Sequence, residues 1–235
     1  MTLEENLKRL ASVPLFFEPG TNWLYSLGPD VLGAVVAAVT GQDFRQAMAE
    51  LVTGPLGMTD TAFSVAPAER NRVAAPYYLE EGKLVRMADD QYLTSPDDRY
   101  FHFSPERVFH RDAYPSGGVG LVGTASDLMK LVDAVRSGSA PLADRSLMEA
   151  MSKNQLKGIE ARPGFGFGLG WGVLVDPVRA ETPQTVGTLA WGGVYGSKWF
   201  ADPARKLSVV TMTTTALDDV VSVDVRNAIY SVLNE

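Results

Sequence analysis

The 235-residue sequence predicts an α+β fold, with a mainly helical and loop region over residues 1–160 and an antiparallel sheet with a C-terminal helix over residues 161–235. Two observations support this division. In the first part, apolar residues recur at the three- and four-residue spacing that is typical of amphipathic helices. In the last third, short β-branched and aromatic runs alternate with turn residues, and strands joined by short turns pair in an antiparallel sheet. We therefore expect a sheet flanked by helices.

The first predicted helix lies at the N-terminus, where Leu3, Leu7 and Leu10 fall on one helical face. Two more helices are expected, over Val31–Thr40 and Phe44–Val52. Because both are followed by glycine, each is predicted to end in a left-handed cap. The capping residues are Gly41 and Gly54, and Asp43 is the predicted N-cap of the later helix.

Residues 64–118 form the least regular part of the sequence, with eight prolines and glycines and clusters of Asp and Arg. Segments of this kind commonly shape a binding site or a lid. One hairpin is expected within it, in which Tyr77–Leu79 turns through Glu81–Gly82 into Leu84–Val85.

The second half shows clearer signals. Thr124 is predicted to cap a helix that runs to about Arg136, with Asp127 in the place that glutamate takes in a capping box. Further helices are expected over residues 145–152 and 218–233. The predicted strands are Phe165–Val175, Thr188–Trp191, Ser197–Ala201 and Lys206–Thr213.

Composition excludes several classes of function. A net charge of −7 and a pI near 4.9 argue against nucleic acid as a partner, because neutralising phosphates requires a surplus of Lys and Arg. The chain has no cysteine, so disulfides and thiolate sites are excluded. The longest apolar run, Val31–Val39, is nine residues, far below the roughly 20 needed to span a membrane. No signal peptide is recognisable, so a cytoplasmic location is the default expectation.

Two polar features have plain structural explanations. His102 and His110 match no metal-ligand spacing, and we interpret them as surface or loop-packing residues, so no metal or other cofactor is expected. The glycine-rich run Ser116–Gly123 lacks the Lys-Ser/Thr pair of a phosphate-binding loop. Close backbone approach explains its glycines better. A Gly-x-Ser-x-Gly nucleophile elbow is absent from the sequence.

Tyr25 and the segment Trp191-Gly192-Gly193 are the remaining candidates. A tyrosine after a Pro-Gly turn is, by itself, more often a half-buried core residue. A Trp-Gly-Gly sequence can equally be a strand that ends in a turn. Together with other passages, however, they resemble one family. The matching passages are PLFFEPGTNWLYSLGPDVLGAVVAAVTGQDF, GPLGMTDTAF, PSGGVGLVGTASDLMKL, GFGLGWGV and WGGVYGSKWFADPARKLSVVTM.

In this order, the passages resemble the C-terminal two thirds of serine hydrolases of the β-lactamase and penicillin-binding-protein superfamily, and are most similar to family VIII carboxylesterases. The resemblance implies a β-lactamase/transpeptidase-like fold in which Tyr25 is the catalytic base. It also implies that Trp191, Gly192 and Gly193 form the third motif, and that the Val194 N–H is an oxyanion donor. Leu27 departs from the family, which has Asn or Ser two residues after the tyrosine.

The nucleophile that the family would supply is missing from this sequence. In the family it comes from a Ser-x-x-Lys motif well upstream of the tyrosine. No serine stands three residues before any lysine here, and Tyr25 lies too close to the first residue for the family's nucleophile helix to precede it. We therefore expect residues 1–235 to be a partial, N-terminally truncated domain, from an incomplete gene, an artificial truncation or a misassigned start codon, that is inactive by itself.

Two functional hypotheses follow. In the first, the parent protein is a carboxylesterase that cleaves short-chain esters through an acyl-enzyme. In the second, the chain is a non-catalytic ligand-binding module or pseudoenzyme of the same fold. Either would take a small-molecule ester or amide as partner. Losing N-terminal strands would leave an open sheet edge, which predicts self-association.

Overall fold

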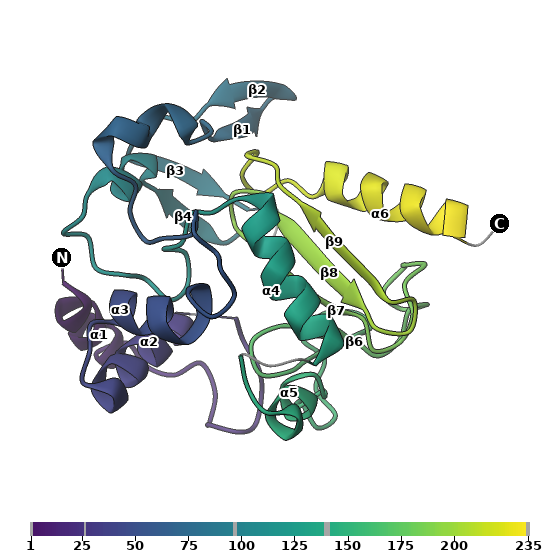
Figure 1. Ribbon diagram of the computed structural model, residues 1–235. Helices are drawn as coiled ribbons and strands as arrows, with labels where there is room; N and C mark the ends of the chain where they lie inside the picture. Colours follow the sequence, from purple (N-terminus) through teal and green to yellow (C-terminus); the bar gives the residue numbers. More distant parts are fainter. Residues whose placement is uncertain (1, 26, 96–97, 139–141, 234–235) are drawn as a thin grey trace.

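A five-stranded antiparallel sheet forms the centre of the C-terminal part (Figure 1). The computed structural model describes residues 2–25, 27–95, 98–138 and 142–233. Neighbouring strands in the sheet follow one another in the sequence, as expected for short connections. The strands are β5 (Phe165–Phe167), β6 (Gly172–Leu174), β7 (Leu189–Gly192), β8 (Lys198–Asp202) and β9 (Leu207–Thr211).

Helices cover both faces of this sheet, which confirms the predicted α+β architecture. On one face lie α4 (Ala125–Ser137) and α5 (Arg145–Met151), and on the other lies α6 (Val220–Leu233). Side chains alternate along a strand, so β8 serves both layers. Ala201 packs with α4 and α5, whereas Phe200 packs against Tyr230 of α6.

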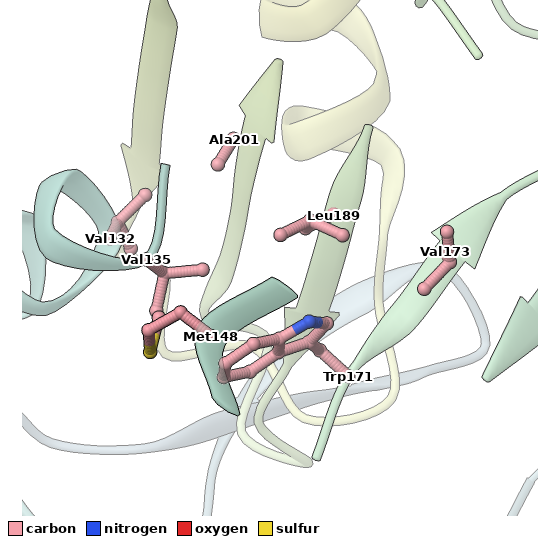
Figure 2. Close-up of a cluster of buried hydrophobic side chains, with 7 residues drawn as sticks. All are labelled: Val132, Val135, Met148, Trp171, Val173, Leu189 and Ala201. Carbon is pink, nitrogen blue, oxygen red and sulfur yellow. The ribbon is translucent and has the colours of Figure 1, made fainter. Parts of the chain in front are cut away.

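The main core lies between α4, α5 and the sheet (Figure 2). Val132 and Val135 of α4 and Met148 of α5 contact Leu189 and Ala201 of the strands. Trp171 belongs to the same core and meets Trp199 edge to face, with ring centroids 6.1 Å apart. The end of the helical region and the sheet therefore share one hydrophobic core.

Two buried carboxylates fix the helices to their neighbours. Asp202, at the end of β8, accepts hydrogen bonds from the Tyr230 hydroxyl of α6 and from Thr185 and the Arg205 N–H. Asp127 of α4 accepts from the Asp60 N–H, Thr61 and Lys130. Thr124 caps α4 as predicted. However, the predicted capping box is only half formed, because the Asp127 carboxylate turns to residues 60 and 61 instead of to the Thr124 backbone.

The N-terminal helices agree with their predicted positions, except at one end. The helices are α1 (Leu3–Ala11), α2 (Gly28–Thr40), α3 (Phe44–Met48) and the π-helical turn η1 (Ala49–Thr53). Gly41 is left-handed at φ 68° and Asp43 caps α3, both as expected. The left-handed cap predicted at Gly54 is wrong. Gly54 has a right-handed φ of −64°, because the chain continues through η1, and Gly57 adopts the left-handed conformation instead.

Between the helical elements lie two hairpins and two 3₁₀ helices. The expected hairpin forms, with Glu81 and Gly82 both at positive φ in its turn. The second hairpin was not predicted, and it moves His102 from a loop into a strand. The elements are β1 (Tyr77–Glu80), β2 (Lys83–Arg86), β3 (Gln91–Thr94), β4 (Tyr100–Phe103), η2 (Pro67–Arg72) and η3 (Pro105–Phe109).

A second correction concerns the first strand predicted in the sheet. The segment predicted as one strand, 165–175, is the hairpin of β5 and β6. Its turn is closed by the Gly168 N–H, which donates to the Trp171 carbonyl at 2.8 Å, and Gly170 adopts φ 122°. The glycines at the centre of the predicted strand are thus turn residues. None of the helices within the described residues is long and apolar enough to cross a bilayer.

Candidate active site

Tyr25 lies in the connection between α1 and α2, two residues before the helical N-cap position Leu27. Its side chain is 39% exposed, so the phenol is accessible and not a core residue. Its ring contacts Trp191 of β7, with centroids 5.1 Å apart and planes inclined by 60°. The candidate tyrosine and the third motif, which come from opposite ends of the sequence, therefore touch directly.

Two further aromatic rings complete this contact. Phe167 of β5 meets Trp191 at a centroid distance of 5.0 Å and Trp23 at 5.1 Å. Trp23 in turn lies 6.5 Å from Tyr25. We call these four residues, Trp23, Tyr25, Phe167 and Trp191, the aromatic ring cluster. Aromatic pairs at such distances each contribute roughly 0.5–1.5 kcal/mol beyond their buried area, so the cluster attaches the Tyr25 segment to the sheet.

The third motif lies at the end of β7 and leads into the turn to β8. Gly192 has no room for a side chain, because a Cβ atom there would come within 2.3 Å of the Lys198 side chain and 2.8 Å of the Ser197 carbonyl. The Gly193 N–H donates to that carbonyl at 2.7 Å. Gly196 adopts φ 101°, which favours glycine. The two motif glycines and Gly196 thus permit a tight turn.

The Val194 N–H, which follows the third motif in this turn, is the candidate oxyanion donor. The Gly193 carbonyl, which belongs to the same peptide as the Val194 N–H, accepts a hydrogen bond from the Gly196 N–H at 3.1 Å, and this bond fixes the orientation of that peptide. The Val194 side chain packs against a small core formed by Met87, Phe103 and Ala216. Among the described residues, no acceptor pairs with the Val194 N–H. A rigidly held, unused N–H is what an oxyanion donor requires.

Tyr25 and all four third-motif residues, 191–194, line one large open cleft of about 3140 Å³. Pockets for small ligands are usually about 300–1,000 Å³, so this cleft extends far beyond one small substrate. Lining the same large cleft does not by itself show that Tyr25 and the third motif lie close together. The direct ring contact between Tyr25 and Trp191 is the stronger observation, because it limits the region where both could reach one ligand.

Charges near the third motif are largely paired. Lys198 forms an ion pair with Asp219, with Nζ and Oδ1 2.7 Å apart. Burial, followed by the negative charge of Asp89, raises the pKa of Tyr195 above its usual value. Its ring packs edge to face on Phe103. The accessible phenol of Tyr25 is therefore the better candidate for proton transfer.

The two histidines lie at the surface, and the glycine-rich run is crowded as predicted. His102 pairs with Asp90, with 2.6 Å between Nε2 and Oδ1, and stacks on Tyr92. In the described part of the chain, no cluster of three His, Asp or Glu side chains could hold a metal ion. A Cβ atom on Gly117 would lie 2.2 Å from the Pro29 carbonyl, so close backbone approach explains this glycine.

Sequence reasoning placed Tyr25 and residues 191–194 but missed Trp23 and Phe167. Their roles depend on contacts between segments that lie far apart in the sequence, which no local pattern reveals. A weak signal was present, because Phe167 belongs to the unusual run Phe165-Gly-Phe-Gly-Leu-Gly-Trp, in which glycines alternate with large apolar residues.

Comparison with known proteins identifies the family of this chain. A sequence model of the family described as Beta-lactamase matches residues 2–231. The chain belongs to the beta-lactamase family. The esterase EstB of Burkholderia gladioli is 45% identical over 236 residues, an alignment that covers 97% of this chain and 59% of EstB.

Solved structures share this fold. EstCE1, described as a hydrolase with promiscuous acyltransferase activity, matches with a TM-score of 0.90 at 37% identity, over 98% of this chain and 62% of EstCE1. An octameric penicillin-binding protein homologue from Pyrococcus abyssi matches with a TM-score of 0.73 at 19% identity, over 100% of this chain and 48% of the homologue. The β-lactamase/transpeptidase-like fold is thus established. The chain spans about half to three fifths of the length of these relatives.

Proposed function

We propose that this chain carries the base and the oxyanion donor of a carboxylesterase site, which cleaves short-chain esters through a covalent acyl-enzyme. The nucleophilic serine and its lysine would come from outside residues 1–235, since these contain no Ser-x-x-Lys. The observation that carries the proposal is the contact between Tyr25 and Trp191 beside the unused Val194 N–H. Similarity to EstB and EstCE1 supports an ester as the substrate.

The proposed reaction assigns one task to each group. The serine hydroxyl adds to the ester carbonyl carbon while its proton passes to the Tyr25 phenolate, which the ammonium group of the Ser-x-x-Lys lysine stabilises. The carbonyl oxygen becomes an oxyanion that accepts a hydrogen bond from the Val194 N–H. The tetrahedral intermediate then expels the alcohol, which takes the proton from Tyr25. Water hydrolyses the acyl-enzyme by the same steps and restores the serine.

Trp191 and Leu27 support preference for a neutral acyl group. The family usually has lysine at the first position of the third motif, and a lysine can hold a substrate carboxylate, whereas Trp191 offers an apolar surface and one N–H donor. Losing a charge-assisted hydrogen bond costs roughly 1.5–3 kcal/mol, or about one to two decades in kcat/KM. Esters without a carboxylate lose nothing by this exchange, so esterase activity is expected to exceed β-lactamase activity.

The test is a comparison of the chain with a form extended by an N-terminal Ser-x-x-Lys segment from its own reading frame. The 235-residue chain should be nearly inert toward p-nitrophenyl butyrate, since removing a serine nucleophile cost about 10⁶ in kcat in a well-dissected hydrolase. The extended form should hydrolyse the ester and prefer it to a chromogenic cephalosporin.

Two matched variants of the extended form separate Tyr25 from its neighbour. Tyr25→Phe should lower kcat by roughly 10²–10⁴, the usual contribution of general acid–base catalysis. Tyr195→Phe keeps the packing on Phe103 and should leave kcat within a few fold. Equal losses in both variants, or a clear preference for the cephalosporin, would reject the proposal.

The absence of Ser-x-x-Lys within residues 1–235 favours the second candidate, a non-catalytic binding module or pseudoenzyme. The DNA upstream of the first codon distinguishes the two. An in-frame Ser-x-x-Lys supports the esterase, whereas a stop codon with no such motif supports the binding module.

We also propose that the chain self-associates through the sheet. Within the described residues, β9 pairs only with β8, so its outer edge has free backbone donors and acceptors. Sedimentation velocity should show an average mass that rises with protein concentration. A monomer at every concentration would contradict this proposal.

A further inference from the structure

Asp30 is a buried carboxylate without a protein partner among the described residues. It lies in the first turn of α2 and is only 2% exposed. Its Oδ1 atom is fully buried and accepts no hydrogen bond from the described part of the chain. Two other buried aspartates, Asp127 and Asp202, each accept several hydrogen bonds. Asp30 therefore stands out from the acids that hold the fold together.

A glycine-rich segment packs closely against this carboxylate. The first turn of α2 packs on the segment Ser116–Gly118, where a Cβ atom on Gly118 would lie 3.2 Å from the Asp30 Oδ2 atom. Ser116 is also buried, and its Oγ atom accepts a hydrogen bond from the Val119 N–H at 3.2 Å. Asp30, Ser116 and Gly118 all line the large cleft. A small ligand entering from the cleft could therefore reach the carboxylate.

No cation of the described chain neutralises Asp30. The two arginines of this neighbourhood donate to backbone carbonyls instead, Arg107 to Tyr114 at 2.6 Å and Arg45 to Ala113 at 3.1 Å. Arg107 also lies over the Tyr114 ring, 4.5 Å from its centroid. Tyr114 experiences the unpaired charge, because burial and then the negative charge of Asp30 raise its pKa. An isolated buried carboxylate is unfavourable unless a donor compensates it.

The carboxylate environment limits which kinds of donor could bind Asp30. A divalent metal would need several oxygen ligands, and Asp30 is not part of any group of three metal-binding side chains in the described residues. A guanidinium fork needs access to both carboxylate oxygens, but Oδ1 of Asp30 is enclosed. A primary ammonium is compact, with three donors that point in different directions.

We propose that Asp30 and Ser116 bind the primary ammonium group of a small amine in the cleft. The ammonium donates to the Asp30 carboxylate and to the free lone pair of the Ser116 hydroxyl. This proposal does not depend on ester hydrolysis, because its evidence is the unpartnered carboxylate and its test measures binding without turnover.

The test uses the 235-residue chain and methylammonium chloride as the probe. Methylammonium should raise the melting temperature in a saturable manner, since a ligand that binds only the folded state stabilises it. Sodium chloride at equal ionic strength should not, and neither should tetramethylammonium, which has no N–H donor. Saturation-transfer NMR on the methyl group of methylammonium provides a direct second measurement that does not depend on melting.

Three variants sharpen the test. Asp30→Asn should melt at the same or a higher temperature than the wild type without amine, because the replaced carboxylate makes no hydrogen bond within the described chain, and should lose the methylammonium response. Ser116→Ala should weaken the apparent affinity several-fold. Asp127→Asn, the matched buried control, should melt at a lower temperature and keep the full response.

The inference would be overturned if Asp30→Asn were destabilised like Asp127→Asn, because the carboxylate would then have a structural partner. Absence of saturation transfer to methylammonium in the wild type would also overturn it. Neither result would affect the ester-hydrolysis proposal, which is tested by the kinetics of the extended form.

Discussion

The sheet and the N-terminal helices are held in very different ways. The sheet shares a closed core with α4 and α5, in which Val132, Leu189 and Ala201 are at most 1% exposed. By contrast, α1 contains no buried residue, and α2 buries only Asp30 and Gly33. Specific contacts such as the aromatic ring cluster attach the N-terminal part. Among the N-terminal helices, α3 does bury Phe44 and Ala47, so the contrast applies to α1 and α2. We therefore expect the segment between α1 and α2, which carries the proposed base, to be less stable than the sheet.

The largest effect should come from removing a side chain from the core. Leu189→Ala should lower the free energy of unfolding by about 2–5 kcal/mol, because it loses burial and leaves a cavity among closely packed neighbours. Val39→Ala is the matched control in α2, where the side chain is 81% exposed and a change within about 0.5 kcal/mol is expected. Urea unfolding of both variants measures the difference. Similar losses would show that the two regions do not differ as described.

The buried Asp202 should contribute the next largest effect. Burial opposes ionisation, but hydrogen bonds from Thr185, Tyr230 and the Arg205 N–H outweigh it and hold the pKa of Asp202 below its usual value. The resulting stability is present above the pKa of the unfolded state, about 3.9, and is lost as pH falls through the lowered pKa of the folded state. Asp202→Asn should cost about 1–3 kcal/mol at neutral pH.

Asp202→Asn should also reduce the amount by which the free energy of unfolding falls as the pH is lowered. Urea unfolding from neutral to acidic pH measures both effects, and the exposed Asp224→Asn on α6 is the control. If the two variants gave parallel pH curves, Asp202 would not be the acid that couples α6 to the sheet.

A smaller and local effect is expected in the aromatic ring cluster. Phe167→Ala removes the ring contact to Trp23 that joins the Tyr25 segment to the sheet, and it should increase amide hydrogen exchange around Tyr25 by roughly 2- to 10-fold, since one such pair is worth about 0.5–1.5 kcal/mol. Exchange within β8 should stay unchanged. Phe16→Ala, at an 85% exposed position, is the control. A uniform increase across the sheet would mean that Phe167 stabilises the whole fold and not the attachment of Tyr25.

The smallest effect concerns an exposed ion pair in α1. Lys8 and Glu4 lie one helical turn apart, with 2.7 Å between charged atoms. Lys8→Met should cost less than about 0.5 kcal/mol, and roughly 1 M salt should abolish the difference. Equilibrium unfolding at two salt concentrations measures it. A larger, salt-independent loss would show that α1 contributes more to stability than its exposed surface suggests.

The sequence predicted those elements whose signals are local. Asp43 and Thr124 correctly predicted where helices begin, and the Glu81-Gly82 pair predicted a hairpin turn. Capping and turn conformations depend on neighbouring residues, so these signals are local. The errors arose where two conformations suit the same local pattern. Gly54 could cap a helix or continue into η1, and only the packing of the whole chain decides.

The candidate site divides in the same way. Tyr25 and residues 191–194 could be predicted from the resemblance of their motifs to a family. Phe167 and Asp30 could not, since the importance of each depends on a distant segment, Trp191 for one and Gly118 for the other. Neither a ring contact nor an unpartnered carboxylate has a signature in the sequence.

The four tryptophans form two pairs. Trp171 lies in the core and Trp199 packs on it, whereas Trp23 and Trp191 belong to the aromatic ring cluster beside the cleft, and Trp191 also packs against the core. The molecule thus carries its own optical reporters: the core pair should emit at shorter wavelength and resist acrylamide quenching, and the cleft pair should respond to solvent and ligands. Variants that keep one pair allow detachment of the Tyr25 segment and collapse of the sheet to be timed separately within a single unfolding trace.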